Sequence, residues 1–171
     1  MDGSLAVLFL LAGLTDMGIN HCGNEGCLAR TDVRSEAALS YGDVIFQDKT
    51  IGRETYVTYG FGRTYGPFQP VIGASVTDNG DAWVGVGATY TANFAANRLY
   101  AKMSLMPGYY SQGDGPDLGH DLEFRSGLEL GYRANNGIKI GISYDHRSNA
   151  EFASVNPGME TLQLRVSIPL N

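Results

Sequence analysis

After residue 30 the chain alternates apolar and polar residues in segments of about ten residues or more, separated by turn residues. A period of two is typical of β-strands with two different faces, and no helical periodicity of useful length competes with it there. The pattern predicts eight strands: Glu36–Phe46, Thr55–Tyr65, Phe68–Val76, Ala82–Ala92, Asn97–Tyr110, Asp121–Arg133, Gly137–Ser148 and Gly158–Leu170. The sequence therefore predicts an all-β fold, an eight-stranded antiparallel β-barrel.

The clearest segment, Asp121–Arg133, has one apolar face and one charged face. The apolar face carries Leu122, Phe124, Leu128, Leu130 and Tyr132, and the charged face carries Glu123, Arg125, Glu129 and Arg133. In a transmembrane barrel the apolar face meets lipid and the charged face lines the lumen, where we expect these four charged side chains to pair. A soluble barrel of the lipocalin kind reverses the two faces. Segment length favours the transmembrane barrel, because a tilted spanning strand needs about 9–11 residues.

Composition agrees with a barrel and limits the partners. The chain has 23 Gly and 10 Tyr, and only 18% of its residues are charged. Gly eases strand curvature, and Tyr and Trp are enriched at membrane–water interfaces, so we expect Trp83 and the tyrosines to lie there. The net charge of −6 argues against a nucleic-acid partner, which normally meets a basic patch.

The first part of the chain is predicted to be separate from the barrel, with residues 1–32 forming an N-terminal segment and residues 33–171 the barrel. Leu5–Leu14 is apolar and has the length of a signal-peptide core, yet no Lys or Arg precedes it. It is either the remnant of a signal or an apolar segment of the mature protein. Cys22 and Cys27 are the only cysteines. A small disulfide loop is favoured over a metal site completed by His21.

Three polar residues near the C-terminal end stand on the apolar face of their strands. The apolar residues that share the parity of His146 are Ile138, Ile140, Ile142 and Tyr144, and those that share the parity of Glu160 are Leu162, Leu164, Val166 and Ile168. Ser148 lies two positions after His146 and shares its face. With an even strand number both barrel ends are periplasmic, so the connection Asn149–Pro157 is extracellular. His146, Ser148 and Glu160 are thus predicted to face lipid at the outer rim.

These residue types match a hydrolytic triad. A Ser becomes a nucleophile when a base takes its proton, and the base needs an acid that orients it. Asn156, in the connecting loop, is a candidate donor to an oxyanion. Isolated polar residues at a barrel rim are otherwise ordinary interfacial residues, and the chain has no Gly-x-Ser-x-Gly motif of an α/β-hydrolase.

The pattern His146-x-Ser148-Asn149-Ala150, followed by Asn156-x-Gly158-x-Glu160 and a last strand ending Ile168-Pro169-Leu170, resembles the PagL-type outer-membrane lipid A 3-O-deacylases. The resemblance is strongest over residues 121–170. It implies that Ser148 is the nucleophile, His146 the general base, Glu160 the orienting acid and Asn156 part of the oxyanion hole. It also implies an esterase that removes the 3-O-linked acyl chain of lipid A without metal or cofactor.

The expected location is then the outer membrane of a Gram-negative bacterium, with lipopolysaccharide and outer-membrane lipid as partners and a homodimer left open. Two alternatives remain at this stage. One is a non-catalytic small outer-membrane barrel with a structural or adhesive role, and the other is a soluble barrel that holds a ligand.

Overall fold

The computed structural model describes residues 3–23 and 25–170. Its elements, in chain order, are helix α1 (Ser4–Asp16), the π-helical turn η1 (Met17–His21) and the strands β1 (Arg30–Asp32), β2 (Ser35–Phe46), β3 (Lys49–Gly60), β4 (Arg63–Tyr65), β5 (Phe68–Thr77), β6 (Ala82–Phe94), β7 (Leu99–Ser111), β8 (Leu122–Arg133), β9 (Lys139–Ser148) and β10 (Met159–Leu170).

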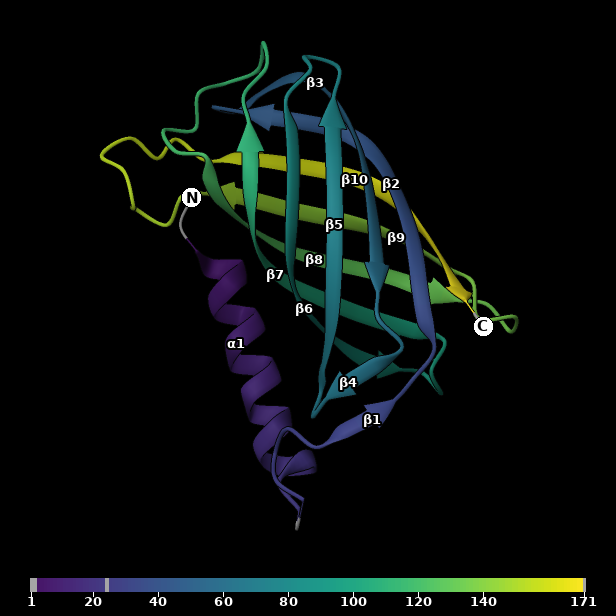
Figure 1. Cartoon of the computed structure of the whole chain (residues 1–171). Helices are drawn as coiled ribbons and strands as arrows, with labels where there is room; N and C mark the ends of the chain where they lie inside the picture. The colour runs from purple at the N-terminus through teal and green to yellow at the C-terminus, as the bar shows by residue number, and fades with distance from the viewer. Residues whose placement is uncertain (1–2, 24, 171) are drawn as a thin grey trace.

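The eight long strands form a closed antiparallel barrel (Figure 1). Neighbours along the chain pair with each other, β10 pairs with β2, and the β5–β6 pairing completes the circle. Closure leaves no sheet edge whose backbone N–H and C=O groups would face lipid. The predicted fold, an eight-stranded antiparallel barrel, is confirmed.

The connections differ between the two ends of the barrel. One end, here named the loop end, carries the connections 112–121 and 149–158. The opposite end, named the turn end, carries the short connections 95–98 and 134–138. Both the start of β2 and the end of β10 lie at the turn end, where Ser35 pairs with Leu170. The two longest connections between the barrel strands thus lie at the same end, as expected of the outer side of outer-membrane barrels.

The outer surface of the barrel is apolar. Large apolar side chains that remain exposed on the strands include Leu39, Val57, Val84, Val86, Leu130, Ile140, Ile142, Leu164 and Val166. Charged side chains of the same strands, such as Arg125 and Arg165, are buried inside. A soluble barrel has the opposite arrangement, so the structure contradicts the lipocalin-like alternative.

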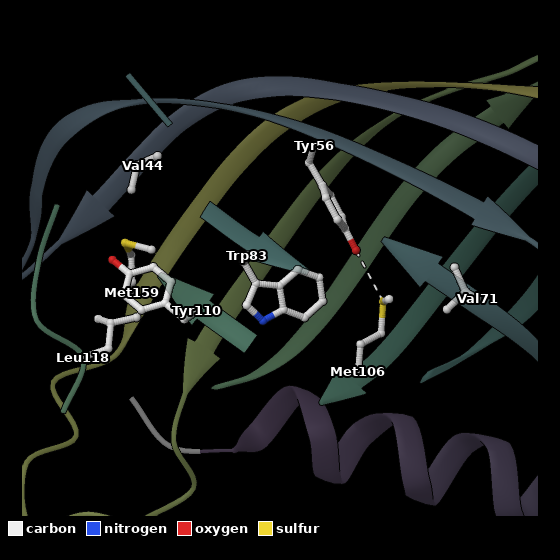
Figure 2. Close-up of a cluster of buried hydrophobic side chains, with 8 residues drawn as sticks. All are labelled: Val44, Tyr56, Val71, Trp83, Met106, Tyr110, Leu118 and Met159. Atoms are coloured by element: carbon white, nitrogen blue, oxygen red, sulfur yellow. Dashed lines mark hydrogen bonds between the residues drawn. The ribbon is translucent and has the colours of Figure 1, made fainter. Parts of the chain in front are cut away.

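A mostly apolar cluster lies in the lumen and is drawn in Figure 2. Its members are Val44, Tyr56, Val71, Trp83, Met106, Tyr110, Leu118 and Met159. The Trp83 side chain is 1% exposed, and its Nε1 donates a hydrogen bond to the Glu123 carbonyl at 3.2 Å. The prediction that Trp83 is an interface anchor is therefore wrong, because Trp83 precedes the lipid-facing Val84 by one residue and so points into the barrel.

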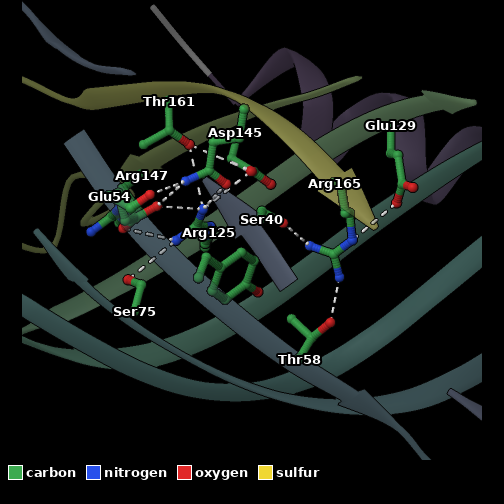
Figure 3. A network of polar contacts seen from close by, with 12 residues as sticks. Ser40, Glu54, Thr58, Ser75, Arg125, Glu129, Asp145, Arg147, Thr161 and Arg165 are labelled. Atoms are coloured by element: carbon green, nitrogen blue, oxygen red, sulfur yellow. Dashed lines mark hydrogen bonds and ion pairs between the residues drawn. The ribbon is translucent and has the colours of Figure 1, made fainter. Parts of the chain in front are cut away.

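Beside this cluster lies a polar network, shown in Figure 3. Glu54 forms ion pairs with Arg125, at 2.8 Å, and with Arg147, and Arg125 also contacts Asp145 at 3.1 Å. All four side chains are less than one-tenth exposed. Two cations are thus matched by two carboxylates, as burial in a low-dielectric interior requires.

The charged face of β8 lines the lumen, and Arg125 and Glu129 form ion pairs there with partners on other strands. Arg125 pairs across the barrel, while Glu129 forms an ion pair with Arg165 at 3.2 Å. Arg133 donates to Asn93 at 2.9 Å. The physical reason is that residues two apart along one strand are about 7 Å apart, whereas the narrow lumen brings opposite strands within ion-pair distance.

One strand boundary also differs from its prediction. The structure has β3 over Lys49–Gly60 and the short β4 over Arg63–Tyr65, in place of a single strand Thr55–Tyr65. The cause is a tight turn at Gln47 and Asp48, whose φ angles of 49° and 63° are both positive. Such a two-residue hairpin turn lets pairing with β2 begin directly after it.

The N-terminal segment lies outside the barrel wall (Figure 1). Cys22 and Cys27 form a disulfide in the loop after η1, so neither thiol is free to join His21 as a metal ligand. The helical stretch Ser4–His21 is long and apolar enough to cross a membrane, by length and composition alone. The chain then reaches the barrel through β1, which pairs with β4.

The Glu54 carboxylate is expected to be critical for barrel stability. Glu54→Ala leaves Arg125 and Arg147 buried with only Asp145 to compensate them, so we expect a loss of about 3–5 kcal/mol of unfolding free energy. Urea titration of the barrel refolded in lipid vesicles measures this loss. Glu151→Ala, in the exposed 149–158 loop, is the control. A change below about 1 kcal/mol for Glu54→Ala, the size expected of an exposed pair, would contradict the expectation.

Candidate active site

The central feature of the site is a His–carboxylate pair on the outer wall of the barrel. His146 of β9 and Glu160 of β10 are direct cross-strand partners near the loop end. The His146 Nδ1 atom lies 3.0 Å from Glu160 Oε1. Both residues share the outward face of their strands with exposed apolar side chains, including Ile142 and Leu164. The facing and the cross-strand contact inferred from parity are therefore present in the structure.

The pair is shielded from solvent although it faces outward. The side chain of His146 is 4% exposed and that of Glu160 is 16% exposed. The Nε2 atom of His146 is buried and has no hydrogen-bond partner among the described residues. When Nδ1–H donates its hydrogen bond to the Glu160 carboxylate, the neutral imidazole carries its free lone pair on Nε2. The arrangement thus presents an unoccupied base nitrogen, oriented by an acid.

Gly158 packs directly against the imidazole. A Cβ atom at this position would lie 2.8 Å from His146 Cε1, closer than a real contact allows. The residue also has a φ of +71°, a backbone conformation that favours glycine. Gly158 therefore lets the chain pass close over the ring just before β10 begins, and it limits where the ring can lie.

Ser148 ends β9 on the same face and is half-buried. It lines a groove of about 380 Å³, together with Phe124, Ser126, Asn156 and other residues. No hydrogen bond joins the Ser148 hydroxyl to His146 Nε2, because that nitrogen has no partner within the described part of the chain. The structure thus places Ser148 beside the His–Glu pair without a completed triad.

Asn156 is held next to Ser148 by its own side chain. Its Oδ1 accepts a hydrogen bond from the Asn149 backbone N–H at 3.1 Å. Asn149 is fully buried, and its Nδ2 donates to the carbonyls of Leu118 and Val155 at 2.9 and 2.7 Å. This network fixes the loop that follows Ser148 through the Asn156 Oδ1 atom and does not use the Asn156 N–H₂ group. Asn156 and Ser148 both line the groove.

Sequence reasoning missed two neighbours of the site on β8. Ser126 is the cross-strand partner of His146, and Phe124 is the partner of Ser148. Both line the groove, and the Phe124 ring stacks on Phe152 of the loop at a centroid distance of 6.0 Å. The available signal was a lone Ser of the same parity as Phe124 and Leu128, on a strand face that is otherwise apolar.

Within residues 3–23 and 25–170, no group of three or more His, Cys, Asp or Glu side chains is arranged to hold a metal ion.

The fold and the site together define a class: a transmembrane β-barrel with a shielded His–carboxylate pair and a neighbouring Ser on its lipid-facing wall. A family model described as lipid A 3-O-deacylase (PagL) matches residues 33–169. The chain therefore belongs to the PagL lipid A 3-O-deacylase family, and it is an outer-membrane β-barrel protein. No curated protein matches the sequence.

Solved structures agree on the fold. The crystal structure of the outer membrane enzyme PagL is 19% identical, with a TM-score of 0.65 over 79% of this chain and 99% of that one. A de novo designed transmembrane β-barrel is 8% identical, with a TM-score of 0.60 over 82% of this chain and 98% of that one. At such low identity these likenesses show the barrel fold alone. The residues that the family model matches begin at 33, after the N-terminal helix. The division of the chain into a separate N-terminal segment, residues 1–32, and a barrel, residues 33–171, stays a prediction.

Gly158→Ala is expected to displace the His146 ring and to reduce deacylation of lipid A by about 100-fold, the cost of roughly 1 Å of misplacement. Lipid A mass spectrometry over a time course measures the rate. Gly80→Ala is the matched control, because Gly80 has a similar φ of +76° with nothing near its Cβ position. Equal losses in the two variants would show that backbone strain, and not contact with the ring, is responsible.

Proposed function

We propose that this protein is an esterase that hydrolyses the 3-O-linked acyl chain of lipid A through Ser148, His146 and Glu160. Membership of the lipid A 3-O-deacylase family supports the substrate and the bond. The observation that carries the catalytic assignment is the shielded His146–Glu160 contact of 3.0 Å beside Ser148. Polar groups on a lipid-facing wall cost stability, and this cost gives a reason to seek a functional role for the pair.

The proposed reaction has two halves. In the first, Ser148 Oγ attacks the ester carbonyl carbon while His146 Nε2 takes the hydroxyl proton. The sugar oxygen then leaves with that proton, and the acyl group stays on Ser148. In the second half a water gives its proton to Nε2 and attacks the acyl-enzyme. The fatty acid leaves, and Ser148 Oγ regains a proton from His146.

Glu160 and Asn156 support the charges that appear in these steps. The Glu160 carboxylate accepts the Nδ1 hydrogen bond and stabilises the imidazolium while His146 holds the proton. The Asn156 amide donates to the oxygen that becomes negative when the carbonyl is attacked. Its other end is already fixed by the 3.1 Å bond from Asn149, so this donor needs no reorganisation during the reaction.

The position of the groove suits a substrate that never leaves the membrane. Longer loops of outer-membrane barrels face the cell exterior, so the loop end with Ser148 meets the outer leaflet, where lipopolysaccharide resides. The ester then reaches Ser148 from the lipid side while its acyl chain stays among apolar walls.

The second candidate is a non-catalytic barrel with a structural or adhesive role. The observation that favours it is the missing hydrogen bond between Ser148 and His146 Nε2. In the proposed enzyme this bond forms when substrate excludes water from the groove, since catalytic hydrogen bonds are often long in unliganded sites.

Ser148→Ala separates the two functions. We expect wild-type protein, expressed in a Gram-negative host, to remove one hydroxyacyl chain from lipid A, and Ser148→Ala to lower the rate by at least about 1,000-fold. Mass spectrometry of lipid A measures the loss of the acyl chain in both cases. The control is Ser154→Ala, an exposed residue of the 149–158 loop, and this variant is expected to keep full activity. Unchanged lipid A with folded wild-type protein would support the non-catalytic barrel instead.

Asn156→Asp tests the oxyanion donor. The variant keeps an acceptor for the Asn149 N–H but loses the N–H₂ group, so we expect kcat to fall about 100- to 1,000-fold with little change in KM. Steady-state hydrolysis of a soluble ester by the detergent-solubilised barrel provides both constants. A fall in stability with no selective loss of kcat would assign Asn156 to loop structure alone.

A further inference from the structure

Helix α1 is apolar on all sides. No charged residue lies between Ser4 and Thr15, and Val7 and Leu11 are 54% and 63% exposed on the side turned away from the barrel. A helix of this kind is stable where both of its faces meet apolar surroundings. The helical stretch Ser4–His21 has 18 residues, or about 27 Å at ~1.5 Å per residue, close to the ~30 Å thickness of a bilayer core.

The helix docks on the barrel at defined contacts. Phe9 is 5% exposed, and its ring lies 5.5 Å from that of Phe68, centroid to centroid. Gly13 lies so close to the same ring that a Cβ atom would overlap it. Near the turn end the following segment is tied down as well, because Gly66 donates its N–H to the Ala29 carbonyl at 3.0 Å. The helix therefore begins near the loop end and runs toward the turn end along the outer wall (Figure 1).

The N-terminal end of α1 reaches the groove of the candidate active site. Gly3 and Ala6 line that groove opposite Leu105 and Phe124, and Ser148 and Asn156 lie in the same lining. The lining is thus mostly apolar, and its polar members are Ser126, Ser148, Glu151 and Asn156. A volume of about 380 Å³ is within the ~300–1,000 Å³ range of ligand pockets.

We infer that α1 is a wall of the site that receives the acyl chain of the substrate ester, and that the small side chain of Ala6 sets the width of this site. The inference rests on the proposed function, because it takes the ester to lie at Ser148. The occupant is a hydrocarbon chain, since the groove is continuous with the ester-cleaving residues and opens to lipid.

The family model starts at residue 33, so this wall lies outside the part of the chain that the family defines. Barrel residues alone supply one side of the groove, formed by Leu105 and Phe124. With α1 in place, the acyl chain of the substrate lies between two walls. The length and branching of the acyl chain that the groove accepts then depend on the side chain at position 6.

Ala6→Phe is the direct test, made in the full-length protein extracted from outer membranes. The added ring fills the groove, so we expect kcat/KM for a dodecanoyl p-nitrophenyl ester to fall at least tenfold, while that for the butanoyl ester stays within twofold. Ala6→Leu, a smaller change that is less disruptive to folding, is expected to give the same order with a smaller loss. Val7→Phe, which points to lipid, should leave the ratio of the two esters unchanged.

The outcomes separate this inference from the proposed function. Wild-type protein that hydrolyses neither ester, or keeps its activity as Ser148→Ala, contradicts the proposed function. If activity depends on Ser148 but Ala6→Phe has the same ratio of the two esters as wild type, the inference about α1 is overturned and the proposed function stands. Intact-mass analysis of the membrane-extracted protein is the second measurement. A chain that retains α1 supports the wall, and a mature chain that starts after Asp16 overturns it.

Discussion

The whole structure depends on the need to satisfy every backbone N–H and C=O group without water. In a bilayer an open sheet edge has no partner, and the pairing of β5 with β6 removes the last edge. Closure then fixes the two faces of each strand, because alternate side chains point to lipid and to the lumen. The apolar exterior, the charged interior and the position of the site all follow from that single constraint.

A narrow lumen turns the inward charges into a structural system. Glu54 meets Arg125 and Arg147 from opposite strands, and Asp145 adds a second carboxylate. Arg147 lies between His146 and Ser148 in the sequence, so the same strand that is anchored inside by an ion pair presents the candidate reactive groups outside. The interior therefore holds β9 rigidly where the exterior needs accurate placement.

On the lipid side the site is assembled from three kinds of element: strands, a loop and a helix. The register of β9 and β10 sets His146 against Glu160, and rigid strands are well suited to that role. The loop after Ser148 supplies Asn156, which is held by the buried Asn149. A third element, α1, comes from a part of the chain that precedes the barrel and completes the groove from outside. Placement on strands gives accuracy, while the loop and helix give the groove its shape.

The sequence by itself determined the barrel class, the number of long strands and the outward facing of His146 and Glu160, because period-two alternation records which face of a strand meets lipid. It also allowed the family resemblance to be stated from the spacing of His146, Ser148, Asn156 and Glu160. It did not determine the early start of β3, since positive φ angles at Gln47 and Asp48 leave little trace in composition.

Only the tertiary structure decided which groups meet across the barrel. Trp83 is of a residue type that is common at membrane interfaces, but its position in the alternation points it into the lumen, where it is buried. The partners of Arg125 and Glu129, the burial of Ser126 beside His146 and the position of α1 along the groove all join residues far apart in the chain. Such contacts are set by barrel diameter and strand register, which no local pattern of residues specifies.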